Sequence, residues 1–451
     1  MAFLLHQFIH DNAKRTPDAP ALLFRQDTLS YRMLEKAVNQ VASGLRSLGI
    51  ERDQRVAIYL PKQFETVSAM FGTTAAGGVF VPVNPVLKPE QVGHILRDCS
   101  TRILITSPDR ARLLSDTLAE CPDLNYVVLV GSGDAADAHD HGVPTCPWEQ
   151  MLGEPSPPVL KRIDCDMAAI LYTSGSTGRP KGVVLSHRNM MAGAQSVADY
   201  LKNRADDRLL AVLPFSFDYG LSQLTTAFSV GASVVLMDYL LPRDVIRGVA
   251  RYRVTGLAAV PPLWNQLADL PWPEEAMECL RYITNSGGAM PVNTTSQLKS
   301  ALPNTDVYLM YGLTEAFRST FLDPDQVDSR PESMGKAIPN AEILVVRADG
   351  TECDVDEPGE LVHRGALVAL GYWGDREKTE IRFKPAPGQP EGLPNPEMAV
   401  WSGDQVRRDA EGYLYFIGRN DEMIKTSGYR VSPGEIEEVL FGMPDVRQAV
   451  A

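Results

Sequence analysis

A glycine- and hydroxyl-rich stretch at residues 172–187, YTSGSTGRPKGVVLSH, holds the side chains of this chain best suited to binding phosphate. Its glycines allow sharp bends and close approach to a ligand, its hydroxyls donate hydrogen bonds, and its lysine adds a positive charge. The residues concerned are Thr173, Ser174, Gly175, Ser176, Thr177, Gly178 and Lys181. The stretch lacks the Gly-Lys-Ser/Thr sequence of a Walker loop. Alone, it fits a phosphate cradle and a flexible loop equally well.

Further along, the motif YGLTE at residues 311–315 follows an apolar run at residues 307–310. Gly312 lets the chain turn close to a ligand, and a carboxylate such as Glu315 suits a hard cation like Mg²⁺. By itself the motif would be a turn with a solvated glutamate. Together with the upstream loop, it favours a site for a metal-bound phosphate.

Three other segments also place glycines next to polar side chains. They are NSGGA at residues 285–289, SGD at residues 402–404 and GRNDEMIKTSGYRVSPGEIE at residues 418–437. A glycine pair lets a flat ring lie against the main chain, and a carboxylate accepts hydrogen bonds from two hydroxyls. In isolation, the glycine pair would be explained as the end of a strand or helix.

These motifs, in this order and over nearly the whole chain, resemble those of the adenylate-forming ligases. That family includes acyl-CoA synthetases, amino-acid adenylation domains and firefly luciferases. The resemblance implies that residues 173–178 and Lys181 hold the β- and γ-phosphates of ATP, that Thr314 contacts the α-phosphate and that Glu315 holds Mg²⁺. It also implies a nucleotide site formed by Gly287, Gly288, Ala289, Tyr311 and Gly312 around the base, with Asp404 and Arg419 at the ribose.

The resemblance further implies two half-reactions. An acid is activated as its acyl-adenylate, and the acyl group then passes to a pantetheine thiol, that of CoA for preference. Asp421 matches the hinge of a mobile small domain, and Lys425 with Gly428 matches positions that face the second half-reaction. The family's late lysine has no counterpart before Ala451. Either the protein is naturally short or these residues are part of a longer chain, and the abrupt end favours the second.

The acid pocket is expected around LPFSFDYGL at residues 213–221. Phe217 and Asp218 match a Phe-Asp pair whose carboxylate, in amino-acid adenylation domains, binds the substrate α-ammonium. Alternatively, Asp218 caps a helix that begins near Leu221. Val260 is expected on the opposite wall, with Trp264 as a bulky limiter rather than a core residue, and Gly288 completes the pocket.

Several segments, among them PFSFDYGLSQLTTAF and LMDYLLPRDV, resemble the acyl-CoA ligases of exosortase A systems. That likeness does not identify the acid. An aminoacyl ligase that loads a carrier protein remains an alternative, and so does a nucleotide-binding protein without ligase turnover.

Composition agrees with an enzyme of this kind. The net charge of −14 argues against a nucleic-acid partner, and no run of about 18 apolar residues suggests a transmembrane segment. Six scattered cysteines suggest neither a disulfide framework nor a zinc site, which favours a cytoplasmic location.

Short apolar runs alternate with helical patterns and must position these motifs. Residues 55–60, 79–83, 102–106 and 126–130 are expected as buried strands, and residues 31–48 and 64–76 as helices. The expected fold is α/β, with two α/β subdomains at residues 1–160 and 161–322 and a β-rich subdomain at residues 323–420. Residues 421–451 would be the hinge and the beginning of a small α+β lid domain.

Overall fold

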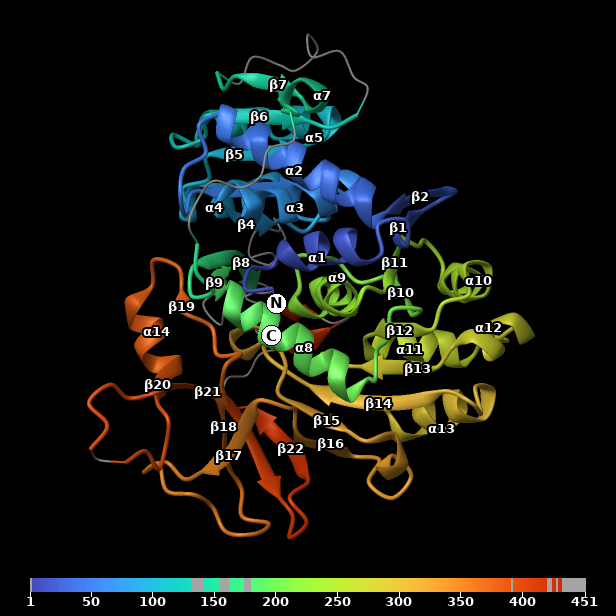
Figure 1. Cartoon of the computed structure of the whole chain (residues 1–451). Helices are drawn as coiled ribbons and strands as arrows, with labels where there is room; N and C mark the ends of the chain where they lie inside the picture. Colours follow the sequence, from blue (N-terminus) through green and yellow to red (C-terminus); the bar gives the residue numbers. More distant parts are fainter. Residues whose placement is uncertain are drawn as a thin grey trace, which may run out of the picture.

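Two large β-sheets with helices packed on their faces form most of the molecule (Figure 1). The computed structural model describes residues 2–131, 142–154, 162–173, 180–390, 392–419, 424–426 and 429–431. The strands and helices alternate along the chain up to about residue 311, and strands dominate after it. The mixed α/β class expected from the sequence is confirmed.

The smaller sheet has eight described strands in the order β19-β9-β8-β4-β3-β5-β6-β7. The neighbours from β4 to β7 are parallel, β8 is parallel to β4, and β9 is antiparallel to β8. The strands are β3 (Arg55–Tyr59), β4 (Val79–Pro82), β5 (Ile103–Thr106), β6 (Tyr126–Leu129), β7 (Thr145–Pro147), β8 (Met167–Thr173), β9 (Lys181–Ser186) and β19 (Gly371–Tyr372).

The larger sheet has 14 strands among the described residues and changes from parallel to antiparallel along its length. Its parallel part is β1 (Pro20–Phe24), β11 (Ser233–Leu236), β10 (Arg208–Ala211), β12 (Gly256–Ala259), β13 (Tyr282–Asn285) and β14 (Asp306–Tyr311), with β2 (Asp27–Ser30) antiparallel at the edge. Its antiparallel part is β15 (Thr320–Leu322), β16 (Ser333–Ala337), β22 (Leu414–Arg419), β21 (Met398–Arg408), β18 (Gly359–Gly365), β17 (Ala341–Val346) and β20 (Phe383–Pro385). A separate pair is formed by β23 (Ile424–Thr426) and β24 (Tyr429–Val431).

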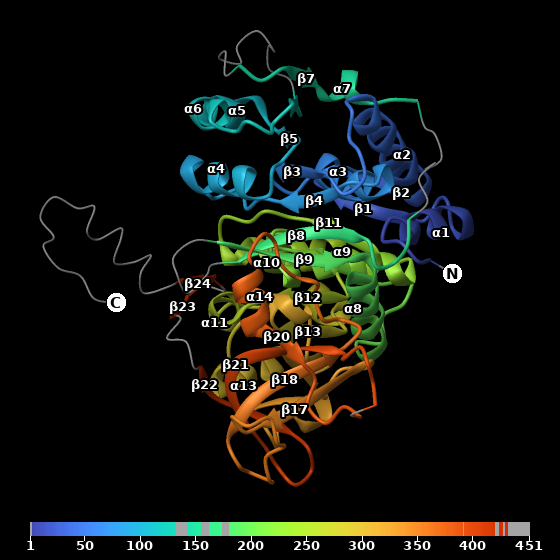
Figure 2. The same ribbon diagram turned by 90° about the vertical axis from the view of Figure 1, so that its left-hand side faces the viewer.

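Helices cover both sheets (Figure 2). They are α1 (Gln7–Arg15), α2 (Tyr31–Ser47), α3 (Phe64–Ala76), α4 (Pro89–Asp98), α5 (Pro108–Leu113), α6 (Ser115–Ala119), α7 (Trp148–Met151), α8 (His187–Tyr200), α9 (Asp218–Val230), α10 (Pro242–Tyr252), α11 (Pro261–Ala268), α12 (Glu274–Cys279), α13 (Val292–Ala301) and α14 (Arg376–Arg382), with short 3₁₀ turns η2 (Thr314–Ala316) and η3 (Pro324–Gln326). None of the helices in the described part of the chain is long and apolar enough to cross a membrane.

Alternation along β3 shows how the core divides. Val56 and Ile58 join the main core, which also contains residues of α2, α3, α8 and α9, whereas Ala57 and Tyr59 join a second core with residues of α4 and β5. Successive side chains of a strand point to opposite faces, so one strand contributes to both cores. On α2, Leu34, Val38, Val41 and Leu45 recur at helical spacing and are all buried.

The strands β1 and β2 belong to the larger sheet, although the strands that follow them in the chain, β3 to β9, belong to the smaller one. β1 lies beside β11 in the larger sheet, with Leu22 opposite Val234. The chain therefore links both sheets from its first 30 residues onward. The subdomain boundaries expected from the sequence remain a prediction.

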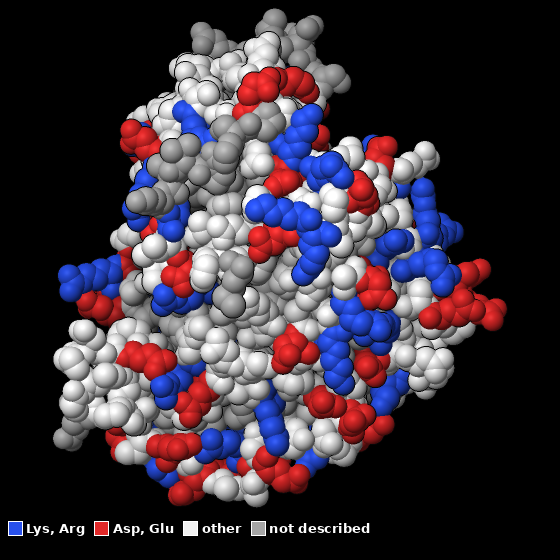
Figure 3. Space-filling view, viewed as in Figure 1, with Lys and Arg blue, Asp and Glu red and all other residues white. Residues whose placement is uncertain are grey.

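On the face seen in Figure 3, acidic and basic side chains are interspersed.

Gly335 lies in β16, which pairs with β15 on one side and with β22 on the other. Its φ is +84°, and a Cβ there would be 1.8 Å from the carbonyl oxygen of Phe321. Gly350 has a φ of +85°, but its nearest atom would be 3.8 Å away. Both positions carry the same left-handed backbone cost for alanine, about 1–2 kcal/mol.

We expect Gly335→Ala to lower the free energy of unfolding by at least about 1 kcal/mol more than Gly350→Ala, because only the first adds a steric clash. Urea unfolding of the two variants measures the difference. Equal losses would show that the backbone at Gly335 relaxes without cost.

Candidate functional site

A cavity of about 900 Å³ lies where the parallel strands of the larger sheet end. Residues that directly follow β10, β12, β13 and β14 line it, among them Phe217, Val260, Gly288 and Thr314. The carboxyl ends of parallel strands share one edge of a sheet, and ligands bind there in open α/β folds. The smaller sheet supplies the facing wall, with lining residues from β3, from the segment after β4, and from β8 and β9.

The expected phosphate-binding stretch begins and ends at this cavity. Thr173, the last residue of β8, pairs with Lys181, the first residue of β9, and both line the cavity. The expected phosphate contacts Ser174, Gly175, Ser176, Thr177 and Gly178 lie between them and outside the described residues. Antiparallel pairing of β8 and β9 therefore fixes both ends of that loop at the cavity wall.

Glu315 and Lys181 meet around the ring of Tyr372. The Tyr372 hydroxyl donates a hydrogen bond to Glu315 Oε1 at 2.6 Å, and Lys181 Nζ lies 5.4 Å from the ring centre. Burial lowers the pKa of Lys181, as does the nearby Arg382, whereas Glu315 raises it. Glu315 is buried, so its carboxylate is held in one orientation at the end of the cavity where Lys181 lies. Sequence reasoning did not identify Tyr372 as part of this arrangement.

The turn after Glu315 is strained. Phe317 is fully buried and has φ +58° and ψ −54°, an unusual conformation for a bulky residue. Its ring packs so closely against α8 that a Cβ on Gly193 would lie 2.5 Å from it. This packing holds the turn, and both Glu315 before it and Arg318 after it reach the cavity.

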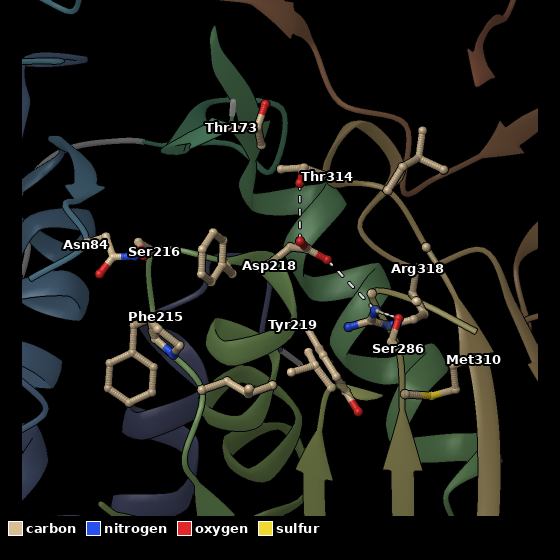
Figure 4. A pocket seen from close by; sticks show the side chains of 18 of the residues that line it. Asn84, Thr173, Phe215, Ser216, Asp218, Tyr219, Ser286, Met310, Thr314 and Arg318 are labelled. Carbon is tan, nitrogen blue, oxygen red and sulfur yellow. Dashed lines mark hydrogen bonds and ion pairs between the residues drawn. The ribbon is translucent and has the colours of Figure 1, made fainter. Parts of the chain in front are cut away.

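Asp218 is the first residue of α9, and its carboxylate does not cap that helix. Instead, Oδ1 accepts a hydrogen bond from the Thr314 hydroxyl at 3.2 Å, and Oδ2 lies 3.9 Å from Arg318 Nη1 (Figure 4). Burial raises the pKa of Asp218, and Arg318 and the Thr314 hydrogen bond oppose this effect. The alternative interpretation of Asp218 as a cap for a helix near Leu221 is therefore wrong.

Arg318 is a buried cation that the sequence analysis missed. Its Nη1 donates to Ser286 Oγ at 3.2 Å, and its guanidinium lies 4.7 Å from the centre of the Tyr219 ring (Figure 4). Tyr219 is fixed in turn by its hydroxyl, which donates to the Thr284 carbonyl at 2.8 Å. An arginine inside the otherwise apolar or small-residue stretch AFRST at residues 316–320 was the available signal.

Gly287, Gly288, Ala289, Tyr311 and Gly312 all line the cavity. Asp404 is buried just behind it and accepts a hydrogen bond from the Tyr311 hydroxyl at 2.5 Å. In the antiparallel pair of β21 and β22, Asp404 is directly opposite Arg419. The two residues expected at the ribose are thus neighbours in space, although Arg419 is described here only through its backbone.

One expected pocket residue belongs to the core. Trp264 is fully buried, and its indole N–H donates to the carbonyls of Ala259 and Thr284 at 3.0 and 3.1 Å. It is not among the residues that line the cavity, although Val260, the first residue of the same segment, is. The prediction that Trp264 limits the pocket is wrong, because Trp264 lies with Leu263 and Leu267 among the buried residues of α11 (Pro261–Ala268).

Three further predicted residues are not placed at the cavity. The expected hinge residue Asp421 and the predicted Gly428 lie outside the described residues. Lys425 lies in β23, paired with Arg430, and only its backbone is described. Their assigned functions stay predictions.

Residues 9–373 match the family described as AMP-binding enzyme. The chain belongs to this family. Its relatives are adenylation domains and acyl-CoA ligases, so the expected adenylate-forming ligase superfamily is confirmed, whereas the resemblance to exosortase-associated ligases stays a prediction.

Relatives of both kinds match nearly the whole chain. Gramicidin S synthase 2 of Aneurinibacillus migulanus is 30% identical over 98% of this chain, which spans only 9% of that protein. An L-proline--[L-prolyl-carrier protein] ligase of Pseudomonas fluorescens is 30% identical over 99% of this chain and 85% of its own length. The structure of the anthranilate CoA ligase AuaEII with anthranoyl-AMP is similar with a TM-score of 0.81 at 26% identity, covering 99% of this chain and 83% of that one.

The described residues contain no cluster of three or more His, Cys, Asp or Glu side chains suited to a metal. A magnesium ion that reaches the site with a nucleotide needs only one or two carboxylates, because phosphates and water supply the other ligands. Glu315, buried at the cavity wall and oriented by Tyr372, fits that requirement.

We expect Glu315→Gln to reduce adenylation by about 100-fold or more, because a metal ligand loses its charge at the reacting phosphate. A higher Mg²⁺ concentration should restore part of the activity. Pyrophosphate exchange over a range of Mg²⁺ concentrations measures both effects, with the exposed Glu120→Gln as the control. Unchanged rates at limiting Mg²⁺ would exclude Glu315 as a metal ligand.

Proposed function

We propose that this chain catalyses ATP-dependent activation of a carboxylic acid and transfer of the acyl group to a pantetheine thiol. One observation supports this most directly: Lys181, Thr314 and Glu315 share a single cavity with the acid-binding candidate Asp218. The acceptor is CoA or the phosphopantetheine of a carrier protein, since both present the same thiol.

The first step joins two anions, and the side chains present suit that task. A carboxylate oxygen attacks the α-phosphorus of ATP, the bond to the β-phosphate breaks, and pyrophosphate leaves. Lys181 and the loop after Thr173 would neutralise the leaving phosphates, and Thr314 would donate to the α-phosphate. Mg²⁺, held at Glu315, would add positive charge there. In the second step the thiol loses its proton to solvent, its sulfur attacks the acyl carbonyl, and the C–O bond to AMP breaks so that AMP leaves.

We further propose that the acid carries an amino group that binds Asp218. This carboxylate lies at the cavity wall and has no capping role, and its nearest cation, Arg318, is 3.9 Å away and beyond hydrogen-bond distance. A substrate ammonium would bring a cation within that distance. The curated relatives include a prolyl-carrier protein ligase, and one similar structure is that of VinN with L-aspartate, at 27% identity and a TM-score of 0.77.

Pyrophosphate exchange with a panel of fatty, aryl and amino acids tests the reaction class. We expect exchange that depends on both ATP and an acid, and thioester formation when CoA or a phosphopantetheinylated carrier is added. Nucleotide binding without exchange for any acid would support the non-catalytic alternative instead.

For Asp218→Asn, we expect kcat/KM for amino acids to fall by about two to four orders of magnitude, while des-amino acids of equal size are spared. The substitution keeps the shape of the side chain but leaves an ammonium without its counter-charge. The measured quantity is the ratio of an amino acid to its des-amino analogue, and the exposed Asp206→Asn is the matched control. An unchanged ratio would leave an ordinary acyl ligase.

The proposed pairing of Asp218 with a substrate ammonium should make amino-acid activation depend on pH. Because burial raises the pKa of Asp218, its carboxylate is protonated at a higher pH than is usual for aspartate. As the pH falls through that value, kcat/KM for amino acids should fall relative to the des-amino analogues. Glu315 adds to the rise in pKa and Arg318 opposes it. The relative pH profile should be flat in Asp218→Asn; a retained slope would assign it to another group.

A further inference from the structure

Arg318 brings more hydrogen-bond donors to the cavity wall than its neighbours accept. The residue is 1% exposed, and Ser286 Oγ accepts from Nη1. Nε and Nη2 have no hydrogen-bond partner among the described residues. These two nitrogens form the edge of a guanidinium that binds a carboxylate through two parallel N–H groups. The carboxylate of Asp218, 3.9 Å from Nη1, is beyond hydrogen-bond distance.

One buried water could satisfy only part of this requirement. A small void of about 10 Å³ lies beside Arg318, bounded by Tyr219, Thr226 and Thr284 among others, and has room for about one water molecule. One water accepts at most two hydrogen bonds, whereas Nε and Nη2 together carry three N–H groups. Arg318 is also among the residues that line the large cavity, so a ligand bound there could supply the acceptors that the water does not.

The charges at this wall give a second, independent constraint. Asp218 and Arg318 carry one negative and one positive charge, both with little exposed surface. A substrate ammonium alone would leave the pair with a net positive charge, and a substrate carboxylate alone would leave it net negative. Burying an uncompensated charge is costly, so a ligand that brings one of each is favoured.

We infer that the acid is an amino dicarboxylic acid, whose ammonium binds Asp218 and whose second, non-reacting carboxylate binds Arg318. This inference rests on the proposed acid activation. The 3.9 Å between the two protein groups favours a substrate in which the ammonium and the second carboxylate are separated by only a few bonds. Arg318 is then a specificity-determining residue, and Ser286 and Tyr219 position its guanidinium.

Pyrophosphate exchange on two matched sets of substrates tests the inference. L-aspartate is compared with L-asparagine, alanine and β-alanine, and L-glutamate with L-glutamine and 4-aminobutyrate. The amides asparagine and glutamine keep the shape of the side-chain carboxylate but lose its charge, and alanine lacks that carboxylate. β-Alanine and 4-aminobutyrate lack the α-carboxylate instead, so the set tests either carboxylate as the one that binds Arg318. We expect wild-type kcat/KM to favour a dicarboxylate over its amide by at least about 100-fold.

In Arg318→Met that preference should largely disappear, and Arg318→Lys should retain part of it as a point charge. The ratio of kcat/KM for the acid to kcat/KM for its amide distinguishes substrate recognition from a structural function, because general damage to the enzyme lowers kcat/KM for both substrates alike. Arg32→Met, at an exposed ion pair on α2, is the control. If Arg318→Met fails to fold, the wild-type ratio and Arg318→Lys decide.

Each outcome bears on the inference. Exchange with monocarboxylic acids at equal efficiency, or a ratio unchanged in Arg318→Met, overturns it and leaves the acid-activating function intact. Absence of exchange with these substrates and with the wider panel of acids overturns the proposed function together with the inference.

Discussion

The need to compensate the buried guanidinium of Arg318 constrains the wall of the cavity. Arg318 is almost fully enclosed, yet it is not in hydrogen-bonded contact with its nearest carboxylate, Asp218. Its position depends on the Ser286 hydroxyl after β13, on the Tyr219 ring in α9, and on the strained residue Phe317 before it. A change in any of these elements therefore moves the positive charge at the cavity wall. The two sheets and α8 are the scaffold that keeps this cation at a fixed place.

Much of the architecture followed from hydrophobic periodicity. The strands at residues 55–59 and 103–106 were predictable because short apolar runs between turns have few other solutions. The placement of β1 was not, because pairing of Leu22 with Val234 depends on contacts 212 positions apart in the sequence. Local patterns contain no information about which of two sheets such a strand will join.

Some residues of the candidate site could likewise be predicted from the sequence, and others could not. Thr173, Lys181, Thr314 and Glu315 were found because their motifs have glycines and polar residues at fixed spacing. Trp264 was misplaced because an aromatic side chain near a pocket motif fits a wall and a core equally well, and only the hydrogen bonds of its indole decide. Arg318 and Tyr372 were missed because each acts through a partner distant in sequence, Asp218 and Glu315 respectively.

The single turn between Glu315 and Arg318 has a consequence for how such an enzyme can diversify. Glu315 and Arg318, only three positions apart, both line the cavity, and Phe317, fitted against Gly193 of α8, leaves the turn no freedom in length. Insertions or deletions here would displace both side chains together. Side-chain replacement at position 318 instead alters one of them alone. New acid preferences in this lineage should therefore arise by point substitution rather than by loop remodelling.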